Sequence, residues 1–178
     1  MAEIAGNTFE GLFIHALKVK GPVVAELKKV GFDATRLEAS YSIDTWREAL
    51  RIAAREYYPT LSPAEAEYQL GVRLVDGYLT TLVGRVIQAA LPFLKPDTLC
   101  MRLPRYFNTG VIGGENAPPT VTKVGERHYQ TTLFGKDGVP WLTAGSVDAV
   151  LRLARVTPTV KVDKVEAGSF TLDITWAA

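Results

Sequence analysis

Apolar side chains recur every three or four residues through the first hundred positions, which is the period of amphipathic helices. One stripe runs from Phe9 to Leu17, a second from Pro22 to Val30 and a third from Ser42 to Tyr57. Gly31 and Pro59 follow the second and third stripes, where glycine and proline commonly end helices. The pattern predicts three short helices in this region.

The strongest helix start is Ser62-Pro63-Ala64-Glu65. Serine at the N-cap, proline at the first helical position and glutamate at the third form a capping box. The apolar pattern continues to Leu91, so we predict one long helix from Ser62 that Pro92 ends. A shorter helix is expected over residues 96–103, before Pro104.

Beyond Pro104 the period changes to two, which is typical of strands. Tyr106 to Ile112 is expected to form one strand, and residues 120–124 and 127–134 to form a hairpin around Gly125-Glu126. A helical stripe returns from Val147 to Ala154. A second hairpin is predicted over residues 159–165 and 169–176.

The last strand alternates most regularly. We expect one set of its side chains to face the helices and the other to face away, because a slip of one residue would expose every apolar group. The inward set is Phe170, Leu172, Ile174 and Trp176, and the outward set is Thr171, Asp173 and Thr175.

This order of elements predicts the α+β class, with an N-terminal helical half followed by an antiparallel hairpin–helix–hairpin sheet. The length of 178 residues suits one domain, and no repeat or linker divides it. We therefore expect a single domain over residues 1–178.

Composition narrows the classes of partner and location. A formal net charge of +1 does not indicate a nucleic-acid-binding protein, which usually carries an excess of basic residues. The apolar stretch Leu70–Leu94 contains Arg73, Asp76 and Arg85, which argues against a membrane span. The N-terminus has no signal-peptide pattern, and the single cysteine, Cys100, excludes an intrachain disulfide. We expect a cytoplasmic protein.

Three stretches resemble an uncharacterised paralogous family of myxobacteria, a domain of unknown function. They are Glu10–Phe13 with Ala16-Leu17, Leu70–Arg73 through Asp76–Tyr78 to Gly84-Arg85, and Arg102–Arg105. His15 departs from this pattern, since the family is expected to carry arginine there. At a more remote level, the element order resembles the fold of haem–nitric-oxide-binding domains, vinyl-reductase-type ligand sensors and small transport-particle subunits. Such a resemblance implies a fold and leaves the function open.

Haem and metal binding are candidate functions because that fold includes haem sensors. The histidines are His15 and His128, and the Tyr-x-Ser-x-Arg signature of haem–nitric-oxide sensors is absent. A partly buried, hydrogen-bonded His15 is expected in place of an axial ligand. Zinc needs three or four ligands at suitable spacing, which the sequence lacks. We expect no cofactor and no metal.

The sequence contains no nucleophile elbow, and the apolar neighbours of Cys100 favour an inert thiol. Arg102 and Arg105, with Tyr106 and Tyr78, are the candidate ligand-binding residues, because paired arginines beside aromatics could bind a carboxylate or phosphate. The alternative is that both arginines tie the helix end to the sheet. We predict this structural role, in which replacing either one lowers thermal stability.

The predicted central helix carries apolar residues over more of its circumference than a surface helix needs. Gly71, Gly77 and Gly84 lie within it, where glycine usually permits close approach of another backbone. The helix is therefore either buried in its own domain or shared with a second copy. For the second case the interface residues are Arg73, Gly77, Thr80, Thr81 and Gly84.

These observations predict a non-enzymatic binding or signalling module. It would act as a homodimer that engages a protein partner or a small apolar ligand. The alternatives are an enzyme acting on a small molecule in a helix–sheet pocket, and a haem-based sensor.

Overall fold

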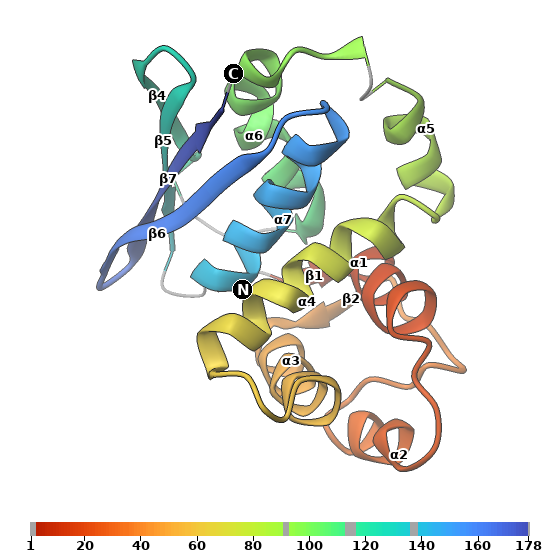
Figure 1. Cartoon of the computed structure of the whole chain (residues 1–178). Helices are drawn as coiled ribbons and strands as arrows, with labels where there is room; N and C mark the ends of the chain where they lie inside the picture. The colour runs from red at the N-terminus through yellow and green to blue at the C-terminus, as the bar shows by residue number, and fades with distance from the viewer. Residues whose placement is uncertain (1–2, 91–92, 113–116, 136–138, 178) are drawn as a thin grey trace.

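The computed structural model describes residues 3–90, 93–112, 117–135 and 139–177 (Figure 1). Its first half contains β1 (Glu3–Ala5), α1 (Gly6–Phe9), the π-helix η1 (Glu10–Ala16), α2 (Pro22–Lys29), β2 (Ser40–Ser42), α3 (Ile43–Tyr57), α4 (Pro63–Tyr78) and α5 (Leu82–Ala90). The second half contains α6 (Pro96–Gly110), β3 (Val111–Ile112), β4 (Thr120–Gly125), β5 (His128–Phe134), α7 (Pro140–Leu153), β6 (Pro158–Glu166) and β7 (Ser169–Trp176). The α+β class is confirmed.

Strands β4, β5, β7 and β6 form an antiparallel sheet in that order, and helices α6 and α7 cover one face of it (Figure 1). Phe170, Leu172, Ile174 and Trp176 of β7 are buried on the helix side, whereas the three polar residues between them are partly exposed. The predicted register of β7 is confirmed. Both hairpins form as expected, although the first turns at Glu126-Arg127, one residue later.

The N-terminal helices enclose an aromatic core. The ring centroid of Phe9 lies 4.3 Å from that of Tyr41 and 4.9 Å from that of Trp46. Phe13 and Phe32 complete the cluster, with their centroids 5.1 Å apart. Tilted and edge-to-face rings of this kind add about 0.5–1.5 kcal/mol per pair beyond their burial. This cluster holds α1, η1 and α3 together around β2.

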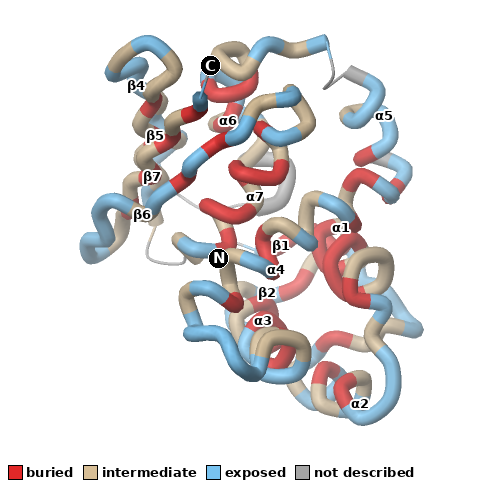
Figure 2. Tube along the Cα trace, viewed as in Figure 1, coloured by how far each residue is buried: buried red, intermediate tan, exposed pale blue. Residues whose placement is uncertain are grey.

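Helix α4 lies between this N-terminal core and the core beneath the sheet (Figures 1 and 2). The predicted capping box starts it, since the backbone N–H of Ser62 donates to Glu65 Oε2 at 3.0 Å and that of Glu65 donates to Ser62 Oγ. A Cβ atom at Gly71 would lie 2.0 Å from the carbonyl oxygen of Leu142 in α7, and one at Gly77 would lie 1.9 Å from that of Gly11 in η1. The backbone of α4 therefore touches a neighbouring helix on two sides.

The predicted helix from Ser62 to Leu91 is wrong, because it is interrupted after Tyr78. The hydroxyls of Thr80 and Thr81 donate to the carbonyl oxygens of Gly77 and Tyr78, both at 2.7 Å. Thr81 Oγ1 also accepts from the N–H of Gly84 at 3.1 Å, as an N-cap residue does. These side chains satisfy backbone groups outside a helical ladder, so the chain turns and α5 starts in a new direction. The predicted end at residues 91–92 lies outside the described residues.

The expected helix end before Pro104 and the strand from Tyr106 are also wrong. Helix α6 continues through Pro104 to Gly110, and β3 occupies only two residues. Proline removes one helical hydrogen bond. Leu99, Cys100 and Leu103 are buried on one side of α6, so the packing of this face outweighs the lost bond.

Candidate functional site

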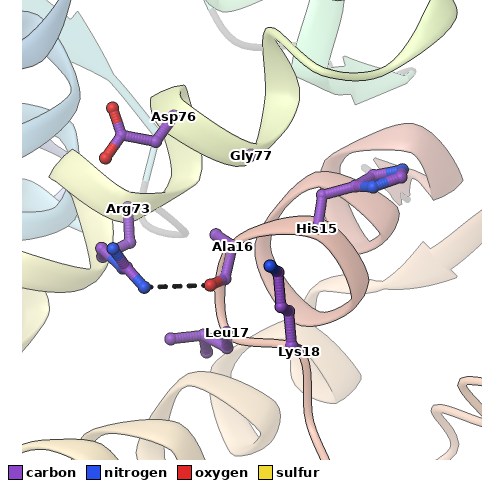
Figure 3. Close-up of a pocket in the computed structure, with 7 residues that line it drawn as sticks. All are labelled: His15, Ala16, Leu17, Lys18, Arg73, Asp76 and Gly77. Atoms are coloured by element: carbon purple, nitrogen blue, oxygen red, sulfur yellow. Dashed lines mark hydrogen bonds between the residues drawn. The ribbon is translucent and has the colours of Figure 1, made fainter.

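A hollow of about 330 Å³ lies where the end of η1 meets α4 (Figure 3). Its walls come from two segments that are far apart in the sequence. The lining residues are His15, Ala16, Leu17, Lys18, Arg73, Asp76 and Gly77.

The termination of η1 builds one wall of this hollow. The N–H of Leu17 donates to the carbonyl of Leu12, and the N–H of Val19 donates to that of Phe13 at 3.0 Å. Lys18, between them, takes a left-handed conformation with φ of 50°, which is uncommon for residues other than glycine. Arg73 Nη2 donates to the carbonyl oxygen of Ala16 at 3.0 Å, so a cation from α4 satisfies the negative end of η1.

The groups around the hollow are charged and of both signs. Arg73 and Asp76 both come from α4, whereas Lys18 and His15 come from the η1 side (Figure 3). His15 Nε2 lies 3.1 Å from Glu10 Oε1. His15 is thus partly buried and hydrogen-bonded, as predicted. Ligand sites for apolar molecules are lined mainly by apolar side chains. This hollow therefore suits water or a small polar solute and does not suit an apolar ligand.

The four residues predicted to bind a ligand do not form one site. Arg102 and Arg105 are exposed on the outer side of α6, and Tyr106 is partly buried in the same helix. Tyr78 ends α4, where its hydroxyl accepts from Asn7 Nδ2 at 3.5 Å. No contact described for these residues joins Tyr78 to the arginines.

The predicted structural role of the arginines is not supported either. Within the described parts of the chain, neither guanidinium has an ion pair or hydrogen bond to an acid or a carbonyl. Helix α6 continues through Pro104, where the sequence predicted its end, and both arginine side chains are exposed on it.

Replacing Arg102 or Arg105 with alanine is therefore expected to change the free energy of unfolding by less than about 0.5 kcal/mol. A matched control is Arg152→Ala, because Arg152 Nε lies 2.6 Å from the buried Asp148 carboxylate. That variant should lose about 1.5–3 kcal/mol. Urea unfolding followed by circular dichroism measures all three. A loss above about 1 kcal/mol in Arg102→Ala, twice the surface expectation, would restore the structural role.

The predicted dimer residues divide into two groups. Arg73 and Thr80 are exposed, whereas Gly77, Thr81 and Gly84 are buried within the chain. Gly77 meets η1, and a Cβ atom at Gly84 would lie 1.9 Å from the carbonyl oxygen of Tyr78. The glycine strip is thus not a surface that a second copy could reach, and the close approach it permits is within the chain. The homodimer itself stays a prediction, which light scattering at micromolar concentration tests.

Two clusters of titratable side chains were not anticipated from the sequence. Asp97 Oδ1 accepts from the hydroxyl of Tyr129 at 2.6 Å and from Lys123 Nζ at 3.0 Å. These hydrogen bonds lower the pKa of Asp97, and burial together with the bond to Asp97 raises that of Tyr129. The cluster joins the start of α6 to β4 and β5. Asp97 lies 26 residues from Lys123 and 32 from Tyr129 in the sequence, so no local pattern reveals the cluster.

The second cluster lies on the sheet face away from the helices. His128 Nε2 lies 2.7 Å from Asp173 Oδ1, and Gln130 Nε2 donates to the same oxygen at 3.3 Å. Burial alone would raise the pKa of Asp173, but the bonds from His128 and Gln130 outweigh it and lower that pKa. The cross-strand register explains this contact, which required knowledge of strand pairing.

Cys100 is fully buried, and burial raises the pKa of its thiol to about 12. The thiolate is the reactive form, and a pKa raised from 9.0 to about 12 lowers its abundance about a thousandfold near neutral pH. We expect Cys100 not to react with a disulfide reagent in the native protein at pH 8 within hours, and to react within minutes in urea. The Cys100→Ser variant is the blank. Rapid reaction of the folded protein would show that the thiol is accessible.

Comparisons with solved structures define the class of fold. An H-NOX protein from S. oneidensis in the Fe(II)NO ligation state matches with a TM-score of 0.72 and 13% identity, covering 98% of this chain and 100% of that one. An oxygen-binding H-NOX domain related to soluble guanylate cyclases matches at 0.68 and 12% identity, covering 97% and 92%. An unliganded H-NOX protein mutant from K. algicida matches at 0.68 and 9% identity, covering 98% and 97%. The chain therefore has an H-NOX-like fold, which confirms the remote resemblance to haem–nitric-oxide-binding domains.

The chain belongs to the family described as protein of unknown function DUF2378, whose model matches residues 2–177. This confirms the resemblance to a family without an assigned role. No curated protein matches the chain. Among the described residues, no helix is long and apolar enough to cross a membrane.

Because H-NOX proteins share this fold, haem binding has to be considered. The surroundings of the two histidines show whether either could ligate haem iron. His15 borders the hollow that Lys18, Arg73 and Asp76 line, and His128 stands among polar side chains on the uncovered sheet face. Neither position offers the apolar walls that a haem macrocycle requires. A thiolate can also ligate haem iron, but the Cys100 side chain is fully buried in the core beneath the sheet, together with Leu99 and Leu103.

The second half has an apolar core of its own. Leu99, Leu151, Leu172 and Ile174 are fully buried together between α6, α7 and the sheet. Within the described residues, no three His, Cys, Asp or Glu side chains meet as a metal site would need. The residues present do not fit haem.

Proposed function

We propose that this protein is a non-enzymatic binding module that uses an H-NOX-like fold to engage a protein partner, and that it does so without haem. The observation that carries the proposal is the placement of the histidines. The fold of haem-binding sensors extends over nearly the whole chain, while both imidazoles lie on polar, partly exposed surfaces. A protein partner is favoured over a small apolar ligand because the hollow beside α4 is lined by charged groups.

The haem-based sensor is the second candidate, and the likeness to H-NOX structures favours it. An absorption spectrum separates the two. Protein purified from cells supplied with a haem precursor should be colourless, and hemin added in equimolar amount should give no Soret band of a ligated haem. A Soret band that His15→Ala or His128→Ala removes would support the sensor and overturn the haem-independent proposal.

Binding to a protein partner needs its own test. The tagged chain, expressed at its natural level in its own cells, should be recovered in a complex of defined stoichiometry with one other protein. Recovery of the chain alone, at the mass of a monomer or homodimer, would contradict the proposed function.

A further inference from the structure

Helix α5 has two apolar faces, of which only one contacts the rest of the described chain. Ile87 packs against the core beneath the sheet. Leu82 and Val86, by contrast, are 84% and 74% exposed, and Ala89 is exposed beside them. Positions i, i+4 and i+7 lie on one side of a helix, so these three form a continuous stripe. Phe93, after the helix, is 87% exposed.

The arrangement of the helices leaves this stripe open. Figure 1 shows α5 apart from the other helices at one side of the molecule, and Figure 2 shows most of its length as exposed. Soluble monomers rarely leave adjoining large apolar side chains in water, because burying each one contributes about 1.5–3 kcal/mol. The stripe therefore indicates a surface that another molecule covers.

The charged residues of the segment that contains the stripe are almost all of one sign. Residues 79–110 carry four basic side chains and one acidic side chain, whereas the whole chain has a net charge of only +1. The acidic side chain, Asp97, already accepts hydrogen bonds from Lys123 and Tyr129. The basic ones are Arg85, Lys95, Arg102 and Arg105, and all four are exposed.

These charges help to identify the molecule that covers the stripe, for which the candidates are a second copy of the chain, a lipid surface and a helix of another protein. A second copy in a two-fold contact would bring one Arg85 next to the other, with no free carboxylate in residues 79–110 to separate them. Helices that lie on lipid surfaces carry several Lys and Arg along their polar face, whereas Arg85 is the one cation on α5, and the other three cations of residues 79–110 lie beyond that helix. An amphipathic helix with carboxylates beside its apolar face would complement both features, because its apolar side chains would pack on the stripe and its carboxylates would pair with the basic side chains.

We propose that Leu82, Val86 and Phe93, flanked by Arg85 and Lys95, form a docking surface for an acidic amphipathic helix of another protein. This inference rests on the proposed function and names the partner's chemistry and the place where it binds. The apolar side chains of the partner would cover the stripe, and its carboxylates would pair with the flanking cations.

The probe is a synthetic helical peptide of about 15 residues, with leucine at i, i+4, i+7 and i+11 and glutamate on both flanks. Titration into 15N-labelled protein should shift amide resonances of residues 82–105 and few others. A peptide with lysine in place of glutamate should bind at least about tenfold more weakly, and added salt should weaken the glutamate peptide.

A matched pair of variants locates the surface. Val86→Asp should weaken peptide binding by about tenfold or more, because it places a carboxylate in the apolar stripe. Val165→Asp makes the same change at a valine that is 62% exposed on β6, and should leave binding unchanged. Both changes are at exposed positions, and circular dichroism checks that both variants fold.

Three results would overturn the docking surface. They are equal binding of the two peptides, an equal effect of both variants, or resonance shifts of residues 82–94 that arise from anionic vesicles or from raised protein concentration instead of from the acidic peptide. The native complex distinguishes this failure from failure of the proposed function. If that complex forms and survives Val86→Asp, the function stands and the surface lies elsewhere.

Discussion

Replacing Gly71 with alanine is expected to destabilise the protein by about 3 kcal/mol, the upper end of what overpacking usually costs. Alanine is favoured over glycine by about 1 kcal/mol in the interior of a helix, so in open space the change would stabilise α4. Here the added Cβ would lie 2.0 Å from the carbonyl oxygen of Leu142 and 2.9 Å from the backbone N of Ser146. Both are backbone atoms of α7 and cannot rotate away, so the two helices must separate.

The control for this change is Gly125→Ala, in which the new methyl would meet only the Cβ of His128, at an ordinary 3.7 Å. Its free energy of unfolding should stay within about 0.5 kcal/mol of wild type. Chemical denaturation of both variants gives the comparison. A Gly71→Ala protein as stable as wild type would mean that α4 and α7 are further apart than the structure places them.

Replacing Trp176 with alanine is expected to cost about 3–5 kcal/mol, through lost burial and the cavity left behind. The indole is 9% exposed and stacks on Tyr129, with centroids 5.7 Å apart and an interplanar angle of 11°. Trp141→Ala is the matched control, because Trp141 is 37% exposed at the start of α7 and should lose much less. Thermal unfolding followed by circular dichroism measures both. Equal losses would show that the last residues of β7 are not held against the core.

Local signals predicted most of the fold. The alternation of β7 and the capping box at Ser62 each depend on residues that are close in sequence, and the structure confirms both. The break after Tyr78 was missed because threonine has only a low helix propensity, so Thr80 and Thr81 weaken a helix without excluding it. The continuation through Pro104 was missed for the opposite reason, since burial of Leu99 and Leu103 outweighs a local signal that is normally decisive.

The candidate site was harder to predict because its parts come from distant segments. The glycines of the central helix correctly indicated close backbone approach, but no local pattern shows that Gly11 and Leu142 are the neighbours. The polar hollow depends on how η1 ends at Lys18, where a lysine takes a conformation that glycine usually occupies. The exposed stripe on α5 could not be recognised from the sequence, because residues 82–90 were predicted to continue one long helix, either buried in its own domain or shared with a second copy.

The two-sided backbone contact of α4 has a consequence for local opening of the chain. A helix held by Gly71 against α7 and by Gly77 against η1 cannot slide, rotate or fray in its middle unless both neighbours move. The amide protons of α4 should therefore exchange with solvent only through events that also release the aromatic core and the sheet. Protection factors along α4 would then all report one value, that of global unfolding, whereas those of α5 would fall well below it.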